Sequence, residues 1–434
     1  MDTKNNPYQK PDDFWLPLDN AAKIYPAVIS RELTAVFRIS AVLKDRIKIK
    51  SLIKAVHALK DRFPYYKVLL KKGFFWYYLE YTDHKIPVKV ENQPPCRRFP
   101  ADGLMFRILA VKNRLSVEFS HILTDGSGAF EFFKSLLVIY FENCGIKIPP
   151  DFDFCRPGEI IPEEEFEDSY NRYFKESIPP MPMQPKAFHV PFPLSAVPRF
   201  DVLNAVLSID EIKTRAGEKG VNMTVYLTSI YLFVLQDIYK SLKSISRYKK
   251  SKILRIQVPV NLRNIYPSVT MRNFSLFVMP EIDLRLGHYT FDEIIKTVYH
   301  QMQLETDEKL INKIISRNVG SEKKILVRGI PLFLKSLILY LKYYSLGTSQ
   351  YSGVITNLGH VTFPPVLNEC IECLIITPPP PNKILKINCG MIGFNNKLVL
   401  SFGSITKSKE LEKKFLKFLV DQGIKVKLTT YKID

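Results

Sequence analysis

Cysteine is scarce in this sequence, and its spacing gives no sign of a disulfide framework or a metal site. The first 13 residues are polar and carry no signal-peptide pattern, so we expect reduced thiols and a cytoplasmic protein. Cys370 and Cys373 form a CxxC pair, but no second pair stands at zinc-finger spacing, and positions i and i+3 of a strand point to opposite faces. They are expected to be core residues, and no metal is predicted. The six cysteines are Cys96, Cys144, Cys155, Cys370, Cys373 and Cys389.

Long uninterrupted hydrophobic runs are also missing. The most hydrophobic stretch, residues 325–346, contains Arg328, Lys335 and Lys342, which makes it a poor bilayer span. These cations stand seven residues apart and therefore share one stripe of a helix with a broad apolar face. Two interpretations stay open. The helix packs in a protein core, or it lies on a membrane or lines a hydrophobic substrate channel.

Acidic residues are too few to balance the basic ones. The chain has 62 Lys and Arg against 43 Asp and Glu, which gives a net charge of +19. A positive field favours anionic partners such as a phosphorylated cofactor, an acidic carrier protein or an anionic membrane. The cations are spread along the chain and no nucleic-acid module is present, so nucleic acid is not an expected partner. A solvated basic surface without any partner explains the charge equally well.

The length of 434 residues is too great for one ordinary core and suits two domains. Residues 149–198 hold 11 of the 30 prolines, and proline this dense prevents regular helix and interior strand. We therefore predict an N-terminal domain at 1–148, a linker at 149–198 and a C-terminal domain at 199–434. Two domains in one chain can complete a site between them, so a monomer is expected.

Strand and helix patterns alternate in both halves, which predicts an α/β fold. Strands are predicted on both sides of Lys72-Gly73 and at residues 33–43, 104–111, 114–120, 202–209, 253–260, 274–282, 353–357, 370–377, 385–394, 398–404 and 424–430. Helices are predicted at 49–63, 127–141, 291–308, 326–344 and 408–420, with two more capped by Asp210 and Thr224.

The segment His121-Ile122-Leu123-Thr124-Asp125-Gly126 carries the clearest chemical signal. A strand of alternating apolar residues leads to His121, and a helix pattern follows Gly126. A strand-to-helix turn can present a side chain to a cleft while the backbone is held. Histidine suits proton transfer near neutral pH, since its ordinary pKa is about 6.5. A surface histidine beside a helix capped by Asp125 is the structural alternative.

This His-x-x-x-Asp-Gly segment resembles the signature of the thioester-dependent acyltransferase superfamily. That group includes chloramphenicol acetyltransferase, the condensation domains of peptide synthetases, plant alcohol acyltransferases and polyketide-associated acyltransferases. The chain looks most like bacterial alcohol acetyltransferases, although Ser120 stands where many members have a further histidine. The segments at Pro259 to Arg263, at Arg272-Asn273-Phe274 and at Thr356 to Gly359 fit the resemblance in order and spacing.

The resemblance implies two chloramphenicol-acetyltransferase-like domains, each a two-layer α+β sandwich with a mixed sheet, and an active-site tunnel between them. His121 would act as general base for an alcohol or amine that attacks the thioester of an acyl-CoA. Acyl-CoA would be a co-substrate, with no cofactor permanently bound. Asp125 would face away from substrate and pair with an arginine, for which Arg263 is the candidate. Gly126 would permit the tight turn into the helix.

Stabilising a negatively charged oxygen needs hydroxyl or amide donors, and Ser352, Thr356 and Asn357 are the candidates. Two further functions stay open. The donor could be an acyl carrier protein, as in condensation domains, or the chain could be a non-catalytic binding module on the same fold. Peripheral contact with a membrane is a further candidate interaction.

Overall fold

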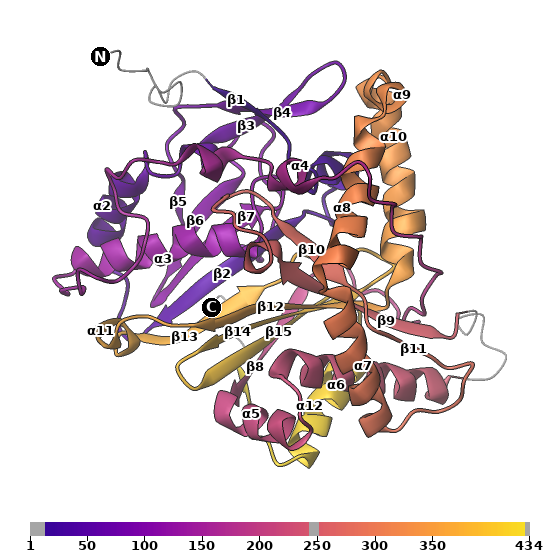
Figure 1. The fold of residues 1–434 in the computed structure, drawn as a ribbon. Coiled ribbons are helices and arrows are strands. Elements are labelled where there is room, and N and C mark those ends of the chain that lie inside the picture. The colour runs from indigo at the N-terminus through magenta and orange to yellow at the C-terminus, as the bar shows by residue number, and fades with distance from the viewer. Residues whose placement is uncertain (1–13, 243–250, 430–434) are drawn as a thin grey trace.

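The computed structural model describes residues 14–242 and 251–429, and two mixed β-sheets organise them (Figure 1). One sheet has five strands and the other eight, and a separate three-stranded sheet lies at the N-terminal end. Helices pack on both large sheets, so the predicted α/β class with mixed sheets is confirmed. Two parts of the sequence-based predictions lie outside the described residues. They are the polar segment 1–13 and Thr430, the last residue of the strand predicted at 424–430.

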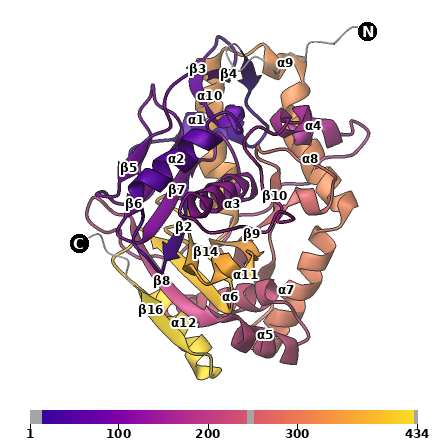
Figure 2. The same cartoon turned by 90° about the vertical axis from the view of Figure 1, so that its left-hand side faces the viewer.

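The five-stranded sheet positions the His121 segment. Its order is β13-β2-β7-β6-β5, and only the β5–β6 pair is parallel. Residues of β7 that alternate, such as Val117 and Phe119, pack into a core beneath helices α2 and α3 (Figure 2). The bounds are β2 (Val36–Leu43), β5 (Val88–Val90), β6 (Phe106–Val111), β7 (Arg114–Ser120), β13 (Ile371–Thr377), α2 (Ile49–Leu59) and α3 (Gly126–Glu142).

One strand of this sheet comes from late in the chain. β13 pairs antiparallel with β2, with Ile376 opposite Ile39. The sheet formed mainly by the first half therefore requires a strand from the second half. The domain limits at 148 and 199 stay a prediction, but the described fold joins the two halves through this strand as well as through residues 149–198.

The eight-stranded sheet carries the second large core. Its order is β10-β9-β12-β14-β15-β8-β16, and β11 pairs with β9. The core holds apolar side chains from these strands and from helices α5, α6, α7 and α12. The bounds are β8 (Asp201–Ser208), β9 (Ile253–Asn261), β10 (Ser275–Val278), β11 (Glu281–Asp283), β12 (Gly353–Val361), β14 (Ile387–Phe394), β15 (Lys397–Ser404), β16 (Val426–Thr429), α5 (Ile209–Glu218), α6 (Met223–Ser241), α7 (Phe291–Glu305) and α12 (Glu410–Asp421).

The remaining elements are mostly short. The three-stranded sheet has the order β1-β4-β3. A helix that was not predicted, α8, packs on the short helix α4, which itself interrupts the proline-rich segment. The bounds are β1 (Trp15–Pro17), β3 (Val68–Lys72), β4 (Tyr77–Tyr81), α1 (Tyr25–Val28), α4 (Ser169–Tyr173), α8 (Glu308–Lys323), α9 (Ile325–Arg328), α10 (Leu332–Lys342) and α11 (Pro365–Asn368), with single turns at Ala22–Ile24, Pro64–Tyr66, Glu163–Phe166, Leu262–Asn264, Tyr343–Gly347 and Thr348–Gln350.

Two predicted helix caps are wrong by two residues each. The side chain of Ser208, not Asp210, accepts from a backbone amide at the start of α5. Asn222, not Thr224, caps α6 in the same way. In both cases a suitable polar residue stands just before the predicted cap, and the helix begins there.

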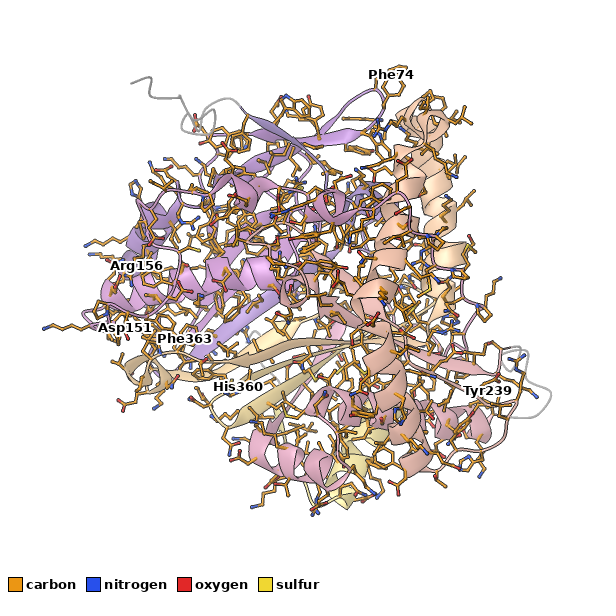
Figure 3. The ribbon with its side chains drawn as sticks, viewed as in Figure 1. Phe74, Asp151, Arg156, Tyr239, His360 and Phe363 are labelled. Atoms are coloured by element: carbon orange, nitrogen blue, oxygen red, sulfur yellow. The ribbon has the colours of Figure 1, made fainter. Side chains whose placement is uncertain are left out.

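The helix predicted at 326–344 differs most from expectation. It breaks around Gly329 and Pro331 into α9 and α10, and its burial is the reverse of a core helix. Lys335 is 3% exposed, whereas Phe333 is 68% exposed. The core-packed interpretation is therefore wrong. Phe74 of the β3–β4 loop lies at the same edge of the molecule (Figure 3).

Within the described residues, no single helix has the length and hydrophobicity to cross a bilayer. α5 and α6 meet that condition only when they are taken together, and they are bent by 79° relative to each other.

Candidate active site

His121 lies in the turn that joins β7 to α3, as the strand-turn-helix pattern predicts. Its backbone amide donates to the carbonyl of Ala35 at 2.9 Å. Leu123 N donates to the Ser120 carbonyl at 2.9 Å, and the Ser120 hydroxyl accepts from Ile122 N at 3.2 Å. These bonds fix the backbone on both sides of His121, so the position of its ring is set by the sheet.

Two aromatic rings contact the His121 imidazole. Tyr25 stacks on it with 5.6 Å between ring centroids and 17° between planes, and Phe37 lies at 4.5 Å and 32°. His121 keeps part of its surface exposed. Burial nevertheless lowers the pKa of His121 to about 4, and the charge of Asp125 and hydrogen bonds that Thr124 and Asn273 accept from the ring only partly oppose this. The ring is therefore neutral at neutral pH and has a nitrogen lone pair available.

A second set of contacts holds Asn273 against the same loop. Its Nδ2 donates to the His121 carbonyl at 3.0 Å and to Asp19 Oδ2 at 2.9 Å. Asp19 is fully buried and also accepts from Ala22 N at 2.8 Å. Burial raises the pKa of Asp19, while the nearby Arg272 opposes that shift. Neither Asp19 nor Asn273 was among the predicted site residues, although the segment containing Asn273 was.

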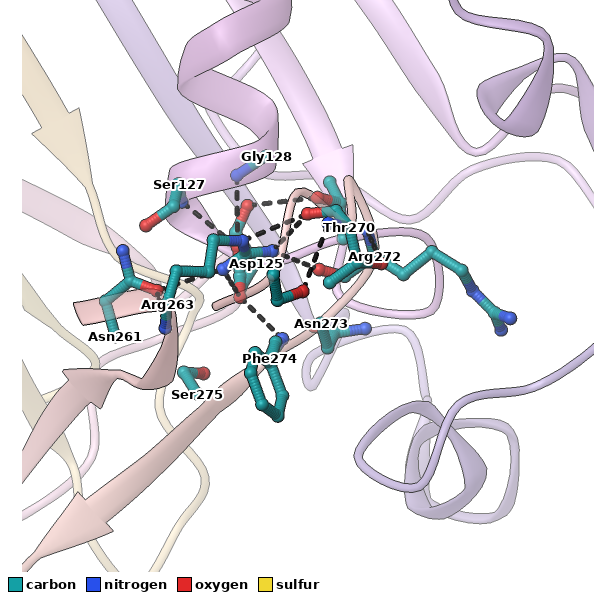
Figure 4. A network of polar contacts seen from close by, with 12 residues as sticks. Asp125, Ser127, Gly128, Asn261, Arg263, Thr270, Arg272, Asn273, Phe274 and Ser275 are labelled. Carbon is teal, nitrogen blue, oxygen red and sulfur yellow. Dashed lines mark hydrogen bonds and ion pairs between the residues drawn. The ribbon is translucent and has the colours of Figure 1, made fainter. Parts of the chain in front are cut away.

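Asp125 is the centre of a polar network (Figure 4). Its Oδ1 accepts from Ser127 N at 3.1 Å and Gly128 N at 3.0 Å, which caps α3. Its Oδ2 accepts from Phe274 N at 2.7 Å and from Arg263 Nη1 at 2.9 Å. Burial alone would raise the pKa of Asp125, but the charge of Arg263 and these hydrogen bonds outweigh it and lower the pKa. The carboxylate is thus ionised, and each of its oxygens accepts two hydrogen bonds from the protein.

Arg263 uses its whole guanidinium inside the protein. Besides Asp125, it donates to the Thr270 carbonyl through Nε at 3.0 Å and Nη2 at 2.8 Å, and to the Arg272 carbonyl at 2.6 Å. The Asp125–Arg263 pair expected from the sequence is therefore present. It ties the turn after β7 to residues 270–274, the segment that also carries Asn273.

Two glycines stand just after Asp125 at the start of α3, and only Gly128 is confined by a backbone atom. A Cβ on Gly126 would come within 2.8 Å of Leu358 Cδ1, and its φ is not in the left-handed region. The predicted reason, freedom to make a tight turn, is wrong. Gly128 is more confined, because a Cβ there would meet Thr124 Oγ1 and the Met271 carbonyl, the latter at 2.5 Å. Thus α3 approaches both residues 271 and 358 closely.

The predicted oxygen-stabilising residues have other partners. The Ser352 hydroxyl is buried and accepts from Arg255 N at 3.2 Å. Asn357 donates to Thr224 Oγ1 at 2.9 Å and accepts from Gly359 N at 2.8 Å. Thr356 is partly buried on β12. No hydrogen bond joins any of the three to His121 within residues 14–242 and 251–429.

Tyr25, which stacks on His121, interacts electrostatically with two further tyrosines that were not predicted, Tyr343 and Tyr351. Burial raises the pKa of Tyr25 and Tyr351, and it raises the pKa of Tyr343 to about 12. Tyr343 contributes to the shift of each of the other two, so the three hydroxyls are close enough to interact. All three are therefore protonated at neutral pH and can donate hydrogen bonds. No motif in the sequence marks them as a group.

A cavity of about 300 Å³ lies elsewhere, beside β5 and β6, where His84, Lys89, Phe99 and Arg107 are among its lining residues. None of its lining residues belongs to the turn that carries His121. The tunnel between the two halves therefore stays a prediction.

No family model matches the sequence, and no curated protein matches it either. Solved structures do match the fold. Polyketide synthase associated protein 5 from Mycobacterium tuberculosis aligns with a TM-score of 0.62 at 13% identity over 93% of this chain and 97% of that one. TRI101 from Fusarium sporotrichioides, solved with coenzyme A and T-2, has a TM-score of 0.62 at 11% identity over 96% and 99%.

The condensation domain of the Monacolin K polyketide synthase MokA aligns with a TM-score of 0.56 at 12% identity over 95% of this chain and 97% of that one. The three alignments span nearly all of each chain, including both large sheets. The protein therefore shares the two-lobed, mixed-sheet fold of these three solved structures.

Proposed function

We propose that the protein is an acyltransferase in which His121 removes a proton from an alcohol or amine that attacks an acyl thioester. One observation carries the proposal. His121, whose imidazole is neutral and which keeps part of its surface accessible, stands on a turn held by two sets of contacts, one through Asp125 and one through Asn273. General-base catalysis requires both the unprotonated form and a fixed position.

The proposed reaction needs no covalent enzyme intermediate. The acceptor oxygen or nitrogen gives its proton to the His121 ring and forms a bond to the thioester carbonyl carbon. The carbonyl oxygen becomes negatively charged in the tetrahedral intermediate. When the carbon–sulfur bond breaks, the carbonyl reforms and the protonated ring returns its proton to the departing thiolate. His121 is neutral again at the end.

Asp125, Gly126 and Arg263 are proposed as positioning residues. Every strong contact of Asp125 and Arg263 is to protein groups, so neither has a free donor or acceptor directed at a substrate. For the negatively charged oxygen, Tyr25 is a better candidate than Ser352 or Asn357, because its ring lies against the His121 ring. The raised pKa of Tyr25 keeps its hydroxyl protonated, so it can donate a hydrogen bond.

The proposed donor is an acyl-CoA. A net charge of +19 attracts the phosphates of CoA, and TRI101, which has this fold, was solved with coenzyme A. An acidic acyl carrier protein is the second candidate, because several matching structures are domains of peptide and polyketide synthases. Bound carrier protein would meet the same positive field.

The test is a screen of donors against mixed alcohols and amines, with the acylated product detected by mass spectrometry. Acetyl-CoA and longer acyl-CoAs are compared with the same acyl groups on a carrier protein. The proposal predicts an acylated product together with one equivalent of free thiol. Turnover with CoA donors excludes strict dependence on a carrier protein, and failure with every thioester contradicts the proposed function.

A further inference from the structure

Helices α9 and α10 present apolar side chains to solvent and turn a lysine inward. Ile325 and Leu326 are 85% and 86% exposed, and six apolar residues of α10 have four-tenths or more of their surface exposed, whereas Leu332 is buried. Lys335 is instead buried, where its Nζ donates to the carbonyls of Arg328 at 3.0 Å and Phe75 at 3.2 Å. Lone exposed apolar residues are ordinary, but a whole helix face is not.

The loop between β3 and β4 extends this apolar face. Leu332 N donates to the Phe74 carbonyl at 2.9 Å, and the Lys335 ammonium lies 4.0 Å from the centre of the Trp76 ring. The loop is therefore fixed to α10, and Phe74 projects at the same end of the molecule (Figure 3). We call the resulting surface the α10 edge, and it consists of Phe74, Phe75, Ile325, Leu326, Phe333, Leu334, Leu337, Ile338, Tyr340 and Leu341.

The charged residues within α9 and α10 have one sign, and the nearby Glu322 of α8 is paired with Lys23. Residues 323–342 contain five cations and no Asp or Glu, and all of these cations except Lys335 are exposed. Lys72 adds another exposed cation next to Phe74. Leucine and aromatic side chains on a helix bordered by lysine and arginine are typical of segments that lie in the interface of an anionic bilayer.

We propose that the α10 edge docks the protein onto the surface of an anionic lipid bilayer. The apolar side chains enter the boundary between headgroups and acyl chains, while Lys72, Lys323, Lys324, Arg328 and Lys342 contact lipid phosphates. A second copy of the chain is a poorer occupant, because two such edges would bring these like charges together. In Figure 1, α9 lies at one end of the molecule and α10 runs from it along the edge.

The docked edge lies close to the proposed catalytic turn. α10 packs against α1, whose Tyr25 stacks on His121. A membrane-dissolved acceptor or donor would therefore meet the protein near this turn. The docking itself depends only on the edge, so it can be tested without any enzymatic assay and holds whatever reaction His121 performs.

The test is co-sedimentation with lipid vesicles. Binding is compared between vesicles of phosphatidylcholine alone and vesicles that also contain phosphatidylglycerol. The wild-type protein should bind the anionic vesicles, and higher salt should weaken that binding. The variant Leu334→Glu/Leu337→Glu/Leu341→Glu should bind them at least about tenfold more weakly, because it replaces three inserted side chains by carboxylates.

A matched variant controls for the added charge. Ile53→Glu/Leu286→Glu/Leu428→Glu changes three apolar residues that are also exposed, by half or more of their surface, but lie outside the α10 edge. It should bind vesicles like the wild type, apart from the small effect of three negative charges. Circular dichroism checks that both variants are folded. Two results with vesicles overturn the proposal: the wild type does not bind them, or both variants lose binding equally. A third result also overturns it: the wild type self-associates instead of binding vesicles, and the substitutions in α10 abolish this self-association.

Discussion

At the residue scale, the ionisation of His121 decides whether it can act as a base. Its ring is surrounded by Tyr25 and Phe37, and burial lowers its pKa to about 4. Only the neutral ring can accept a proton from the acceptor substrate. The base is therefore available over the whole physiological range, unlike an exposed histidine, which is partly protonated near pH 6.5.

This gives a prediction for the pH dependence of acyl transfer. Above about pH 5.5, the protonation of His121 should have no effect on kcat/KM. The value of kcat/KM should decrease as the pH falls through about 4, because the ring becomes protonated. The measurement is kcat/KM against pH with a donor that is stable in acid. A midpoint near 6.5 would mean that the ring is solvated like free imidazole and would contradict the described packing.

The Asp125–Arg263 pair gives a prediction for stability. Both side chains are largely buried, so Asp125→Ala and Arg263→Ala should each lower the free energy of unfolding by about 3–5 kcal/mol, since the remaining charge loses its partner. The double variant should lose less free energy of unfolding than the sum of the losses in the two single variants. Unfolding in denaturant measures the loss of stability, and the rate of acyl transfer is measured on the same variants.

The exposed pair Lys417–Asp421 provides the control for that experiment. Its side chains lie 2.8 Å apart on the surface of α12, and such pairs contribute about 0–1 kcal/mol. Asp421→Ala should therefore leave stability and activity almost unchanged. Equal losses in Asp421→Ala and Asp125→Ala would show that the pair at the turn has no special structural role.

At the element scale, the sequence predicted most strands and helices, but it did not predict which side of each element is turned to the protein interior. Periodicity located β6, β7 and α3 within two residues, because their apolar spacing is regular. In residues 326–344 the same rule identified an apolar face and a cationic stripe, yet it could not say which faces inward. Lys335 is buried because the β3–β4 loop supplies carbonyls and the Trp76 ring, and that contact joins segments far apart in sequence.

Helix α8 was missed although its sequence carries a signal. Ile311, Ile314, Ile315 and Val319 follow helical spacing, and Asp307 caps the first turn through Lys309 N at 2.9 Å. The segment is polar overall, and its apolar stripe is narrow because it covers a small cluster around Phe274. A search for narrow stripes preceded by a cap would have found it.

The start of α3 offers a prediction about close packing. Gly128→Ala should destabilise the protein, because the added methyl group would collide with Thr124 and the Met271 carbonyl. The loss is expected to be about 1–3 kcal/mol and to displace the catalytic turn, so kcat/KM should fall with it. Gly217→Ala in α5 is the control, since no atom lies near its Cβ. It should stabilise the helix by about 0.5–1 kcal/mol, and a similar loss in both variants would contradict the packing at Gly128.

At the scale of the whole molecule, the fold class and the His121 motif could be predicted, but the connections between distant segments could not. Nothing in residues 370–377 indicates that they pair with β2 rather than with a neighbour in the second half. The same limit explains why Asp19, Asn273 and Tyr25 were missed. Each reaches the His121 turn only through the folded chain, and none stands at a fixed spacing from the motif.

The predicted partner of Asp125 was identified correctly because Arg263 lies in a segment that the resemblance marked. Ser352 and Asn357 lie in or next to marked positions as well, but their hydrogen bonds serve the backbone and Thr224. Position along the chain thus located the segments around the site. The direction of each side chain required the structure.

The most direct test of the central claim compares acyl transfer by the wild type and His121→Gln with one active donor and acceptor pair. Glutamine keeps a polar side chain of similar size but cannot act as a base, so kcat/KM should fall by about 10²–10⁴-fold. His300→Gln, which changes an exposed histidine on α7, should retain full activity. If His121→Gln transfers acyl groups as fast as the wild type, His121 is not the base.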